Sequence, residues 1–309
     1  MSKLPLFTRN SVTSDNERVH SYLEASLANN TWRAYRDDLK HFQAWGGTLP
    51  ASPEQIARYL AYYASRHAVA TLTRRLASLS KIHNAQQWAN PVSTALVRTT
   101  FQGIRNRHGV KQRQVAPAIK EDILAMVKNL MGTKGIRDKA LLLIGFAGAF
   151  RRSELADLQY SDFEHVQQGL LIYLRRSKTD QAGQGRKIAI PHARGAVCAI
   201  IALREWLEHS EIIEGPIFRG VNRHGHIGTQ TITPQSIALV VKERAAAVGL
   251  DPTQYSGHSL RAGLVTSAAQ AGISSWKIRQ QTGHKSDAML QRYIRDANIF
   301  VDNAAGGVL

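Results

Sequence analysis

Cysteine is nearly absent from this 309-residue sequence. The single cysteine, Cys198, lies in the apolar stretch Ala-Val-Cys-Ala-Ile-Ile at 196–201. A disulfide within the chain and a zinc site built from several thiolates are therefore excluded, and a reducing compartment is expected. We interpret Cys198 as a small buried apolar residue rather than as a nucleophile or a metal ligand.

Long apolar runs are also missing. The longest, residues 140–150, falls short of the roughly 20 residues that a transmembrane helix needs and is predicted to be a buried helix. The N-terminus has no apolar signal region. The sequence therefore predicts a soluble, cytoplasmic protein with no membrane partner.

Acidic residues are scarce relative to basic ones. The chain has 23 Asp and Glu against 40 Lys and Arg, a net charge of +17. The excess is spread along the chain, since residues 1–116 already hold 16 basic and 6 acidic side chains. This balance favours a polyanionic partner, nucleic acid above all, although a merely soluble basic protein could share it.

Two signatures of cofactor-dependent phosphoryl chemistry are missing as well. The sequence has no Gly-x-x-x-x-Gly-Lys-Ser/Thr loop and no acidic cluster suited to Mg²⁺. His224 and His226 form a conceivable metal pair, but they lie in a Gly-containing loop without further ligands at metal-binding spacing. We therefore expect neither a cofactor nor a metal.

Helical periodicity dominates the first third of the chain. Helices are predicted at 14–28, 31–45, 53–63, from 71 to beyond 82, and at 93–107. The second carries an aromatic stripe of Trp32, Tyr35, Phe42 and Trp45, whose helical spacing indicates core packing rather than base stacking. Together these helices predict a helical-bundle domain over residues 1–108.

A polar, basic segment without apolar periodicity, residues 109–117, is predicted to be a linker to a second domain, 118–309. A β-hairpin is predicted from the strand-like runs 170–174 and 187–191. Helices are predicted near 119–130, 135–149, 195–208, 233–247, 258–270, 274–282 and 286–295. The predicted fold class is mainly α: an N-terminal helical bundle followed by an α-rich domain with a small antiparallel sheet.

Residues suited to phosphodiester chemistry gather in the second domain. His258 and Arg261 are three residues apart, so on a helix they project from one face. His284 follows, and Tyr293 comes nine residues after it. Phosphodiester transfer needs cations on the non-bridging oxygens, an in-line nucleophile and an acid for the leaving oxygen. The Tyr hydroxyl would be the nucleophile, and Arg and His the clamp.

The order of these residues resembles the tyrosine recombinase (phage integrase) family. The matching motifs are His-x-x-Arg-x-Gly at 258–263, Gly-His at 283–284, the tyrosine at 293, Arg-x-x-Glu-Leu at 151–155, and Lys178 at the place of a hairpin lysine. Some relatives carry Trp where His284 stands. The resemblance implies a C-shaped, two-domain DNA clamp.

The resemblance also implies roles for the residues that bind and attack the phosphate. Tyr293 would be the nucleophile, and Arg151 and Arg261 would hold the scissile phosphate, because guanidinium is always charged and binds in a bidentate manner. Arg152 is the neighbouring alternative to Arg151. The Arg-x-x-Glu spacing favours Arg151, which leaves Arg152 as a surface or DNA-facing charge.

The remaining implied roles concern protons. Lys178 would protonate the departing 5′ oxygen, with Lys187 as the rival. His258 would position Tyr293, accept its proton or hold a phosphate oxygen, and His284 would donate to the other non-bridging oxygen. Glu154 would orient His258 or Arg151 without reacting itself.

Basic residues outside this set are candidates for contacts with DNA, each with an ordinary solvated face as the alternative reading. Those in the first domain and the linker are Arg33, Arg36, Lys40, Arg74, Arg75, Lys81, Arg105, Arg107, Lys111 and Arg113.

The resemblance implies site-specific recombination by a homotetramer on two DNA target sites. Strand exchange would pass through 3′-phosphotyrosine links and a Holliday junction. The apolar segment 299–301 would dock into a neighbouring protomer. Two alternatives remain: a type IB topoisomerase that relaxes DNA as a monomer, and a DNA-binding protein of the same fold without the chemistry.

Overall fold

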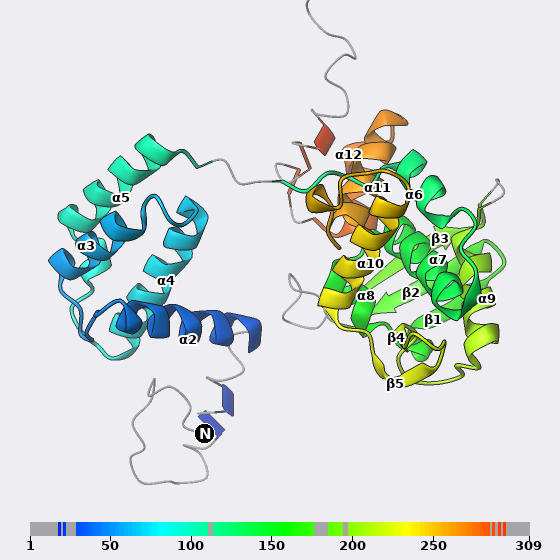
Figure 1. Cartoon of the computed structure of the whole chain (residues 1–309), viewed down its shortest axis with the longest axis horizontal. Coiled ribbons are helices and arrows are strands. Elements are labelled where there is room, and N and C mark those ends of the chain that lie inside the picture. Colours follow the sequence, from blue (N-terminus) through cyan, green and yellow to red (C-terminus); the bar gives the residue numbers. More distant parts are fainter. Residues whose placement is uncertain are drawn as a thin grey trace, which may run out of the picture. The chain divides into compact units, whose positions relative to one another are not determined.

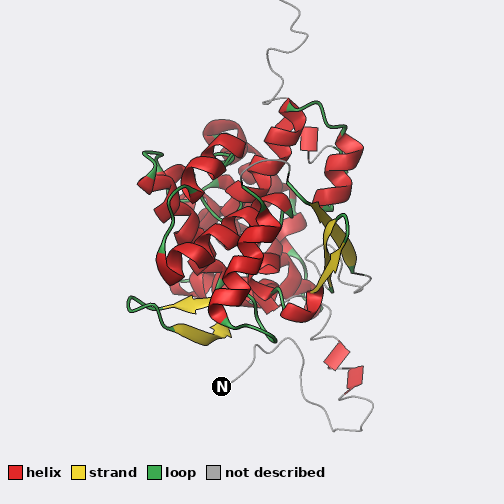
Figure 2. Ribbon diagram, turned by 90° about the vertical axis from the view of Figure 1, so that its right-hand side faces the viewer, coloured by secondary structure: helices red, strands yellow, loops and turns green. Residues whose placement is uncertain are grey.

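The computed structural model describes residues 18–19, 21–22, 29–110, 114–175, 185–193, 197–284, 286–287, 290–291 and 293–294. The chain divides into two compact units, residues 1–113 and 114–309, each described here by itself (Figure 1). Helices make up most of the described chain, and the strands are few (Figure 2). The predicted mainly α fold class is confirmed. None of the described helices is both long and apolar enough to cross a bilayer.

The described part of the N-terminal unit consists of helices joined by short loops. Its elements are α2 (Asn29–Ala44), α3 (Pro53–Tyr63), α4 (Val69–Ala85), η1 (Pro91–Ser93) and α5 (Ala95–His108). Most of the helix predicted at 14–28 lies outside the described residues. α3 begins where expected, because Pro53 occupies its first turn and Ser52 Oγ accepts a hydrogen bond from the Gln55 amide at 3.2 Å.

The core of this unit is aromatic and aliphatic. Phe42 of α2 is fully buried, and Trp32 and Trp45 pack partly buried against the same cluster. The aromatic stripe therefore faces the core, as its helical spacing predicted. A buried carboxylate ties α2 to α4: Asp38 Oδ2 accepts hydrogen bonds from Ser78 Oγ and Arg74 Nη1, both at 2.7 Å.

The second unit combines helices with two small antiparallel sheets. Its elements are α6 (Lys120–Val127), α7 (Gly132–Ala147), α8 (Arg152–Asp157), η2 (Tyr160–Asp162), β1 (Phe163–Val166), β2 (Gly169–Leu174), β3 (Arg186–Pro191), α9 (Ala199–Ser210), β4 (Arg219–Val221), β5 (Ile227–Thr231), α10 (Pro234–Ala247), η3 (Pro252–Gln254), α11 (Ser259–Gln270) and α12 (Ser275–Thr282). The larger sheet has the order β1-β2-β3, and β4 pairs with β5 in the smaller one.

The predicted hairpin is present, and its register decides which side chains face inward. Leu174 of β2 lies opposite Arg186, the first residue of β3. Ile188 and Ile190 are buried, whereas the alternating residues Lys187 and Ala189 are exposed. Because side chains alternate along a strand, Arg186 shares the inward face with the two isoleucines.

The core of this unit lies around α7, which packs against α9 and α11. Leu141, Leu142 and Ile144 of α7 are fully buried, which fits the apolar run at 140–150. Cys198 is buried in the same cluster, as predicted.

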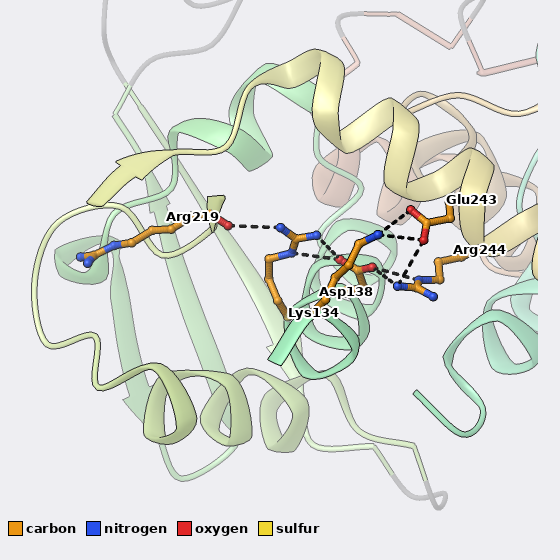
Figure 3. Close-up of polar contacts among 6 residues, drawn as sticks. Lys134, Asp138, Arg219, Glu243 and Arg244 are labelled. Atoms are coloured by element: carbon orange, nitrogen blue, oxygen red, sulfur yellow. Dashed lines mark hydrogen bonds and ion pairs between the residues drawn. The ribbon is translucent and has the colours of Figure 1, made fainter. Parts of the chain in front are cut away.

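A buried ion cluster joins α7 to α10. Asp138 is completely buried, and its Oδ1 and Oδ2 atoms each lie 2.5 Å from a guanidinium, that of Arg137 and that of Arg244 respectively. Figure 3 shows Asp138 beside Arg244, and next to them the exposed pair of Lys134 and Glu243, with nitrogen and oxygen 2.8 Å apart. Two guanidinium groups compensate the burial of one carboxylate, which fixes the two helices to each other.

The first residues of the second unit are bound to the segment that leads into α11. The Ala116 amide donates to the Gln254 carbonyl at 2.8 Å, and the Ala118 amide donates to the Ser259 carbonyl at 2.9 Å. A Cβ atom on Gly263 would collide with the Ala118 carbonyl oxygen. α11 can therefore approach this segment so closely only because residue 263 has no side chain.

Candidate active site

Arg151 and Glu154 stand together at the start of α8. Arg151 precedes the first residue of this helix, and its amide donates to Glu154 Oε2 at 2.9 Å. Its guanidinium pairs with Glu154 Oε1, at 2.5 Å from Nη1. A carboxylate in the first turn suits the positive end of the helix dipole. Glu154 thus fixes both the backbone and the side chain of Arg151.

Arg261, on the first turn of α11, connects the Arg151 segment to His284. Only 2% of Arg261 is exposed. Its Nη1 donates to the Ala149 carbonyl at 2.7 Å, and its Nη2 lies 3.1 Å from His284 Nε2. Burial first, and the nearby Arg151 charge second, lower the pKa of Arg261 to about 10. The guanidinium therefore remains charged at neutral pH.

His284 is held as a neutral ring in one tautomer. Burial, followed by the charges of Arg261 and Arg151, lowers its pKa to about 3. Arg261 has only donors, so His284 Nε2 must accept. The proton then sits on Nδ1 and is donated to Thr282 Oγ1 at 2.7 Å, while Thr282 donates to the Ile278 carbonyl at 2.7 Å. In this arrangement Nε2 serves Arg261 as an acceptor.

His258, immediately before α11, faces Tyr293. His258 Nε2 lies 3.2 Å from the Tyr293 hydroxyl oxygen. Burial lowers the pKa of His258, with further contributions from Arg261 and Arg151. The Tyr293 ring packs on a small apolar cluster that includes Val265 of α11 and Ile278 of α12. A neutral His258 can accept the phenolic proton.

Five side chains drawn from residues 151 to 293 thus lie near one another, with Glu154 as a sixth. They are Arg151, His258, Arg261, His284 and Tyr293. Two guanidinium groups, two neutral imidazoles and a phenol can together hold an anion and deliver an oxygen nucleophile to it.

The expected lysine, Lys178, lies outside the described residues. Its rival, Lys187, is on the outward face of β3, with its ammonium nitrogen 4.9 Å from the centre of the Tyr173 ring. Arg152, the alternative to Arg151, is exposed, and Glu154 pairs with Arg151.

Arg186 belongs to the same group, although sequence reasoning did not single it out. Its Nη2 lies 3.5 Å from Glu154 Oε2, and its Nη1 donates to the Gln281 carbonyl of α12 at 2.9 Å. The one signal in the sequence is its place two residues before Ile188, on the inward face of the second hairpin strand.

Most basic residues proposed for DNA contact in the N-terminal unit are exposed; these are Arg33, Arg36, Lys40, Arg74, Lys81, Arg105 and Arg107. Arg75 differs, because only 7% of it is exposed. Its guanidinium lies 5.5 Å from the centre of the Tyr63 ring and its Nε 3.7 Å from Asp38 Oδ1. An arginine buried in this way is not available to contact a DNA phosphate. Lys111 and Arg113 lie outside the described residues.

The histidines considered as a metal pair are engaged within their own loop. Arg223 Nε donates to His224 Nε2 at 3.0 Å, and the Asn222 side-chain amide lies 3.3 Å from His226 Nδ1. In the part of the chain that the structure describes, no three His, Cys, Asp or Glu residues are grouped so as to hold a metal ion.

Comparison with known proteins agrees with this geometry. A model of the phage integrase family matches residues 118–298, a range that holds the whole group. A second model, the phage integrase N-terminal SAM-like domain, matches residues 20–90.

Individual relatives cover nearly the whole chain. An integrase/recombinase XerD homolog of Selenomonas ruminantium is 41% identical over 97% of this chain and 92% of its own length. The recombinase Cre of Escherichia phage P1 is 23% identical, covering 88% of this chain and 85% of the phage protein.

Solved structures share the fold. A lambda integrase tetramer bound to a Holliday junction has a TM-score of 0.61 and 21% identity, covering 93% of this chain and 79% of that one. The XerH site-specific recombinase in a post-cleavage complex with palindromic difH substrate has a TM-score of 0.63 and 17% identity, covering 82% of this chain and 71% of that one. A family model matches residues 118–298, and a relative is 41% identical over 97% of this chain. This chain therefore belongs to the phage integrase family and is a tyrosine-type site-specific DNA recombinase.

Proposed function

We propose that the protein cleaves and rejoins double-stranded DNA at a specific target site through a covalent bond between Tyr293 and a 3′ phosphate. The observation that carries this proposal is the 3.2 Å separation of the Tyr293 hydroxyl and His258 Nε2 beside the Arg151–Arg261 group. A phenol with a pKa near 10 is a weak nucleophile at neutral pH. It therefore needs a proton acceptor and a cationic surrounding, and both are adjacent.

In the cleavage step, the Tyr293 oxygen attacks the scissile phosphorus and its proton passes to His258 Nε2. Arg151 and Arg261 hold the non-bridging oxygens, and Arg261 exchanges its contact with His284 for the phosphate. Once Arg261 has left it, neutral His284 changes to the tautomer with its proton on Nε2, its Nδ1 accepts from Thr282 Oγ1, and Nε2–H donates to the second oxygen. The oxygen–phosphorus bond to the 5′ side breaks as the new bond forms, and Lys178 protonates the departing 5′ oxygen.

The covalent intermediate conserves the energy of the phosphodiester, so rejoining needs neither ATP nor a metal. A 5′ hydroxyl from the partner duplex attacks the phosphotyrosine, which releases Tyr293 and forms one exchanged strand. Four protomers on two sites act as two pairs: the first pair exchanges two strands and forms a Holliday junction, and the second pair exchanges the other two strands and resolves it. The solved lambda integrase complex named above has that composition.

Segment 299–301, outside the described residues, is proposed to dock on a neighbouring protomer. Deletion of residues 297–309 is then expected to impair tetramer assembly and spare binding to a single site. A tetramer unchanged by the deletion would refute the docking segment.

The positive charge of the chain supports the same proposal. The chain carries a net charge of +17, and residues 1–116 alone hold 16 basic against 6 acidic residues. Contacts between basic side chains and phosphates position a protein on DNA, whereas contacts with bases specify the site. We propose that the protein acts on DNA in the cytoplasm, associated with the nucleoid.

A nicked suicide substrate tests the chemistry, because loss of the fragment bearing the 5′ hydroxyl traps the intermediate. Wild-type protein is expected to form a covalent protein–DNA adduct, and Tyr293→Phe, which lacks only the hydroxyl oxygen, is expected to form none. An adduct with Tyr293→Phe would refute the assignment of the nucleophile. No adduct with either protein would favour a DNA-binding protein without the chemistry.

Two cognate sites on one plasmid separate recombination from relaxation. A recombinase yields junctions and exchanged products only when both sites are present. Relaxation of plasmids that lack a site would favour the type IB topoisomerase instead.

A further inference from the structure

Arg186 joins three parts of the second unit at the candidate site. It is the first residue of β3 and shares Glu154 with Arg151, at 3.5 Å from Glu154 Oε2. It also donates to the Gln281 carbonyl near the end of α12, two residues before Gly283 and three before His284. The base of the hairpin, the start of α8 and the end of α12 thus meet at one guanidinium.

Room for this guanidinium depends on Gly283. A Cβ atom at position 283 would lie 2.6 Å from Arg186 Nη1. Gly283 also has a φ of +67°, a left-handed conformation that ends α12 and favours glycine. Glycine at position 283 is therefore needed for two reasons: the left-handed end of α12 and the space for Arg186.

Arg186 is incompletely satisfied where it lies. Its side chain is 19% exposed, its buried Nε has no hydrogen-bond partner among the described residues, and its buried Nη2 has only the long 3.5 Å ion pair with Glu154. Burial lowers its pKa, and the nearby Arg151 opposes the favourable effect of Glu154. Buried donors without partners are costly, so a site that retains them uses the charge for something other than stability.

The charges at the site identify that use. Arg151, Arg186 and Arg261 contribute three positive charges and Glu154 one negative charge, and His258 and His284 have lowered pKa values. The described group therefore has a net charge of +2. Without Arg186, Glu154 would cancel Arg151 and leave +1, at a place where the attacked phosphate gains negative charge in the transition state.

We propose that Arg186 is a positioning residue for DNA cleavage, which neutralises Glu154 so that Arg151 and Arg261 keep their full charge for the scissile phosphate. The assignment rests on the proposed cleavage by Tyr293. In this assignment Arg186 acts through Glu154 and does not itself hold the scissile phosphate.

The test compares Arg186→Gln with Arg204→Gln on the suicide substrate. Both remove one positive charge from the second unit, but the side chain of Arg204, on α9, is 65% exposed. Arg186→Gln is expected to slow adduct formation by about tenfold or more, with affinity for the uncleaved site within about threefold. Arg204→Gln is expected to remain within about twofold of wild type, because a distant exposed charge is screened.

Rescue separates an electrostatic role from a merely structural one. Because Glu154 also holds Arg151, the effect of Arg186→Gln is measured a second time in a Glu154→Gln background, where no negative charge is left to neutralise. Arg186→Gln is expected to slow adduct formation much less in that background than in wild type, whereas a merely structural role would give the same slowing in both. Arg186→Lys, which keeps the charge, is expected to cleave faster than Arg186→Gln and guards against a folding defect in the glutamine variant.

Equal rates for Arg186→Gln and Arg204→Gln, or an equal slowing by Arg186→Gln in the wild-type and Glu154→Gln backgrounds, would overturn the assignment while leaving cleavage by Tyr293 intact. Failure of wild-type protein to form any adduct is a different result, which overturns the proposed function and this assignment together.

Discussion

Arg261 carries the most buried charge of the candidate site, with 2% of the residue exposed. Its two terminal nitrogens contact the Ala149 carbonyl and His284, so the guanidinium is oriented before any phosphate arrives. Such preorganisation removes the cost of reorientation during the reaction. An ammonium group has the same charge but lacks the fork that lets one nitrogen keep the Ala149 contact while another contacts the phosphate.

Arg261→Lys is therefore expected to slow covalent adduct formation by on the order of a hundredfold. Affinity for the uncleaved site, measured by gel shift, should change by less than about threefold, since most binding comes from other phosphate contacts. A lysine variant that cleaves at the wild-type rate would show that charge alone suffices and that the fork geometry is unimportant.

His284 links the site to acid stability. Its pKa is about 3 in the folded chain, against about 6.5 in an unfolded one. Between these values the unfolded chain binds a proton that the folded chain does not, so stability falls as pH drops from about 6.5 toward 3. Above pH 7 both states are neutral and the residue has no such effect.

We expect His284→Gln to weaken this pH dependence by up to about one proton between pH 7 and 4, measured as the slope of unfolding free energy against pH in urea titrations. His165→Gln, an exposed position on β1, is the matched control. An equal change of slope in both variants would contradict the assigned burial effect.

Two arginines show where residue-level prediction stops. Arg75 has the sequence surroundings of a surface cation, but contacts with Asp38 and Tyr63 from other helices bury it. Arg186 stands beside the exposed Lys187, and only the register of β3 tells the two apart. Both outcomes depend on tertiary neighbours, which local spacing does not contain.

At the scale of elements, the buried Asp138 holds α7 to α10 through the guanidinium of Arg244, and it also pairs with Arg137 of its own helix. Asp138→Asn is expected to lower the free energy of unfolding by about 3–5 kcal/mol, because two buried cations lose their counter-charge. Urea denaturation followed by circular dichroism measures this loss.

The nearby Glu243→Gln is the control, since the Glu243 side chain, which pairs with Lys134, is 50% exposed. Its expected cost is below about 1 kcal/mol. Similar costs for the two variants would mean that the Asp138 cluster is no more important than a surface ion pair.

Long periodic elements were predictable and short ones were not. The helices α7, α10 and α11 lie within a few residues of their predicted bounds, because each combines an apolar period with a start or stop signal. The strands β1, β4 and β5, each of five residues or fewer, were missed. Their side chains are largely polar and exposed, and their pairing comes from partners elsewhere in the fold.

The candidate site was predictable in composition and less so in detail. The order of Arg151, Glu154, His258, Arg261, His284 and Tyr293 carries the resemblance, and the structure brings all six together. The Nε2 of His284 accepts from Arg261 rather than facing outward as a donor, and this detail follows from geometry that no motif encodes.

At the scale of the whole molecule, the net charge of +17 makes DNA affinity strongly dependent on salt. Lys111 and Arg113, in the predicted linker, are proposed to contact phosphates. Changing both to alanine is expected to reduce the slope of log affinity against log salt by about 2. Fluorescence anisotropy with a labelled target site at several salt concentrations measures the slope.

Arg204→Ala with Lys139→Ala, which removes the same charge from α7 and α9, is the control for net charge. A linker variant whose affinity and slope both match wild type would rule out phosphate contacts at these two residues.

The bonds from Ala116 and Ala118 to Gln254 and Ser259 bear on how the protein can be divided for study. A shortened version that starts after Ala118 would lose both bonds. The turn before His258 would then no longer be held by residues 116–118. A shortened version that starts at or before Gln114 keeps them. Whoever produces the second half alone should therefore make the cut on the N-terminal side of residue 116.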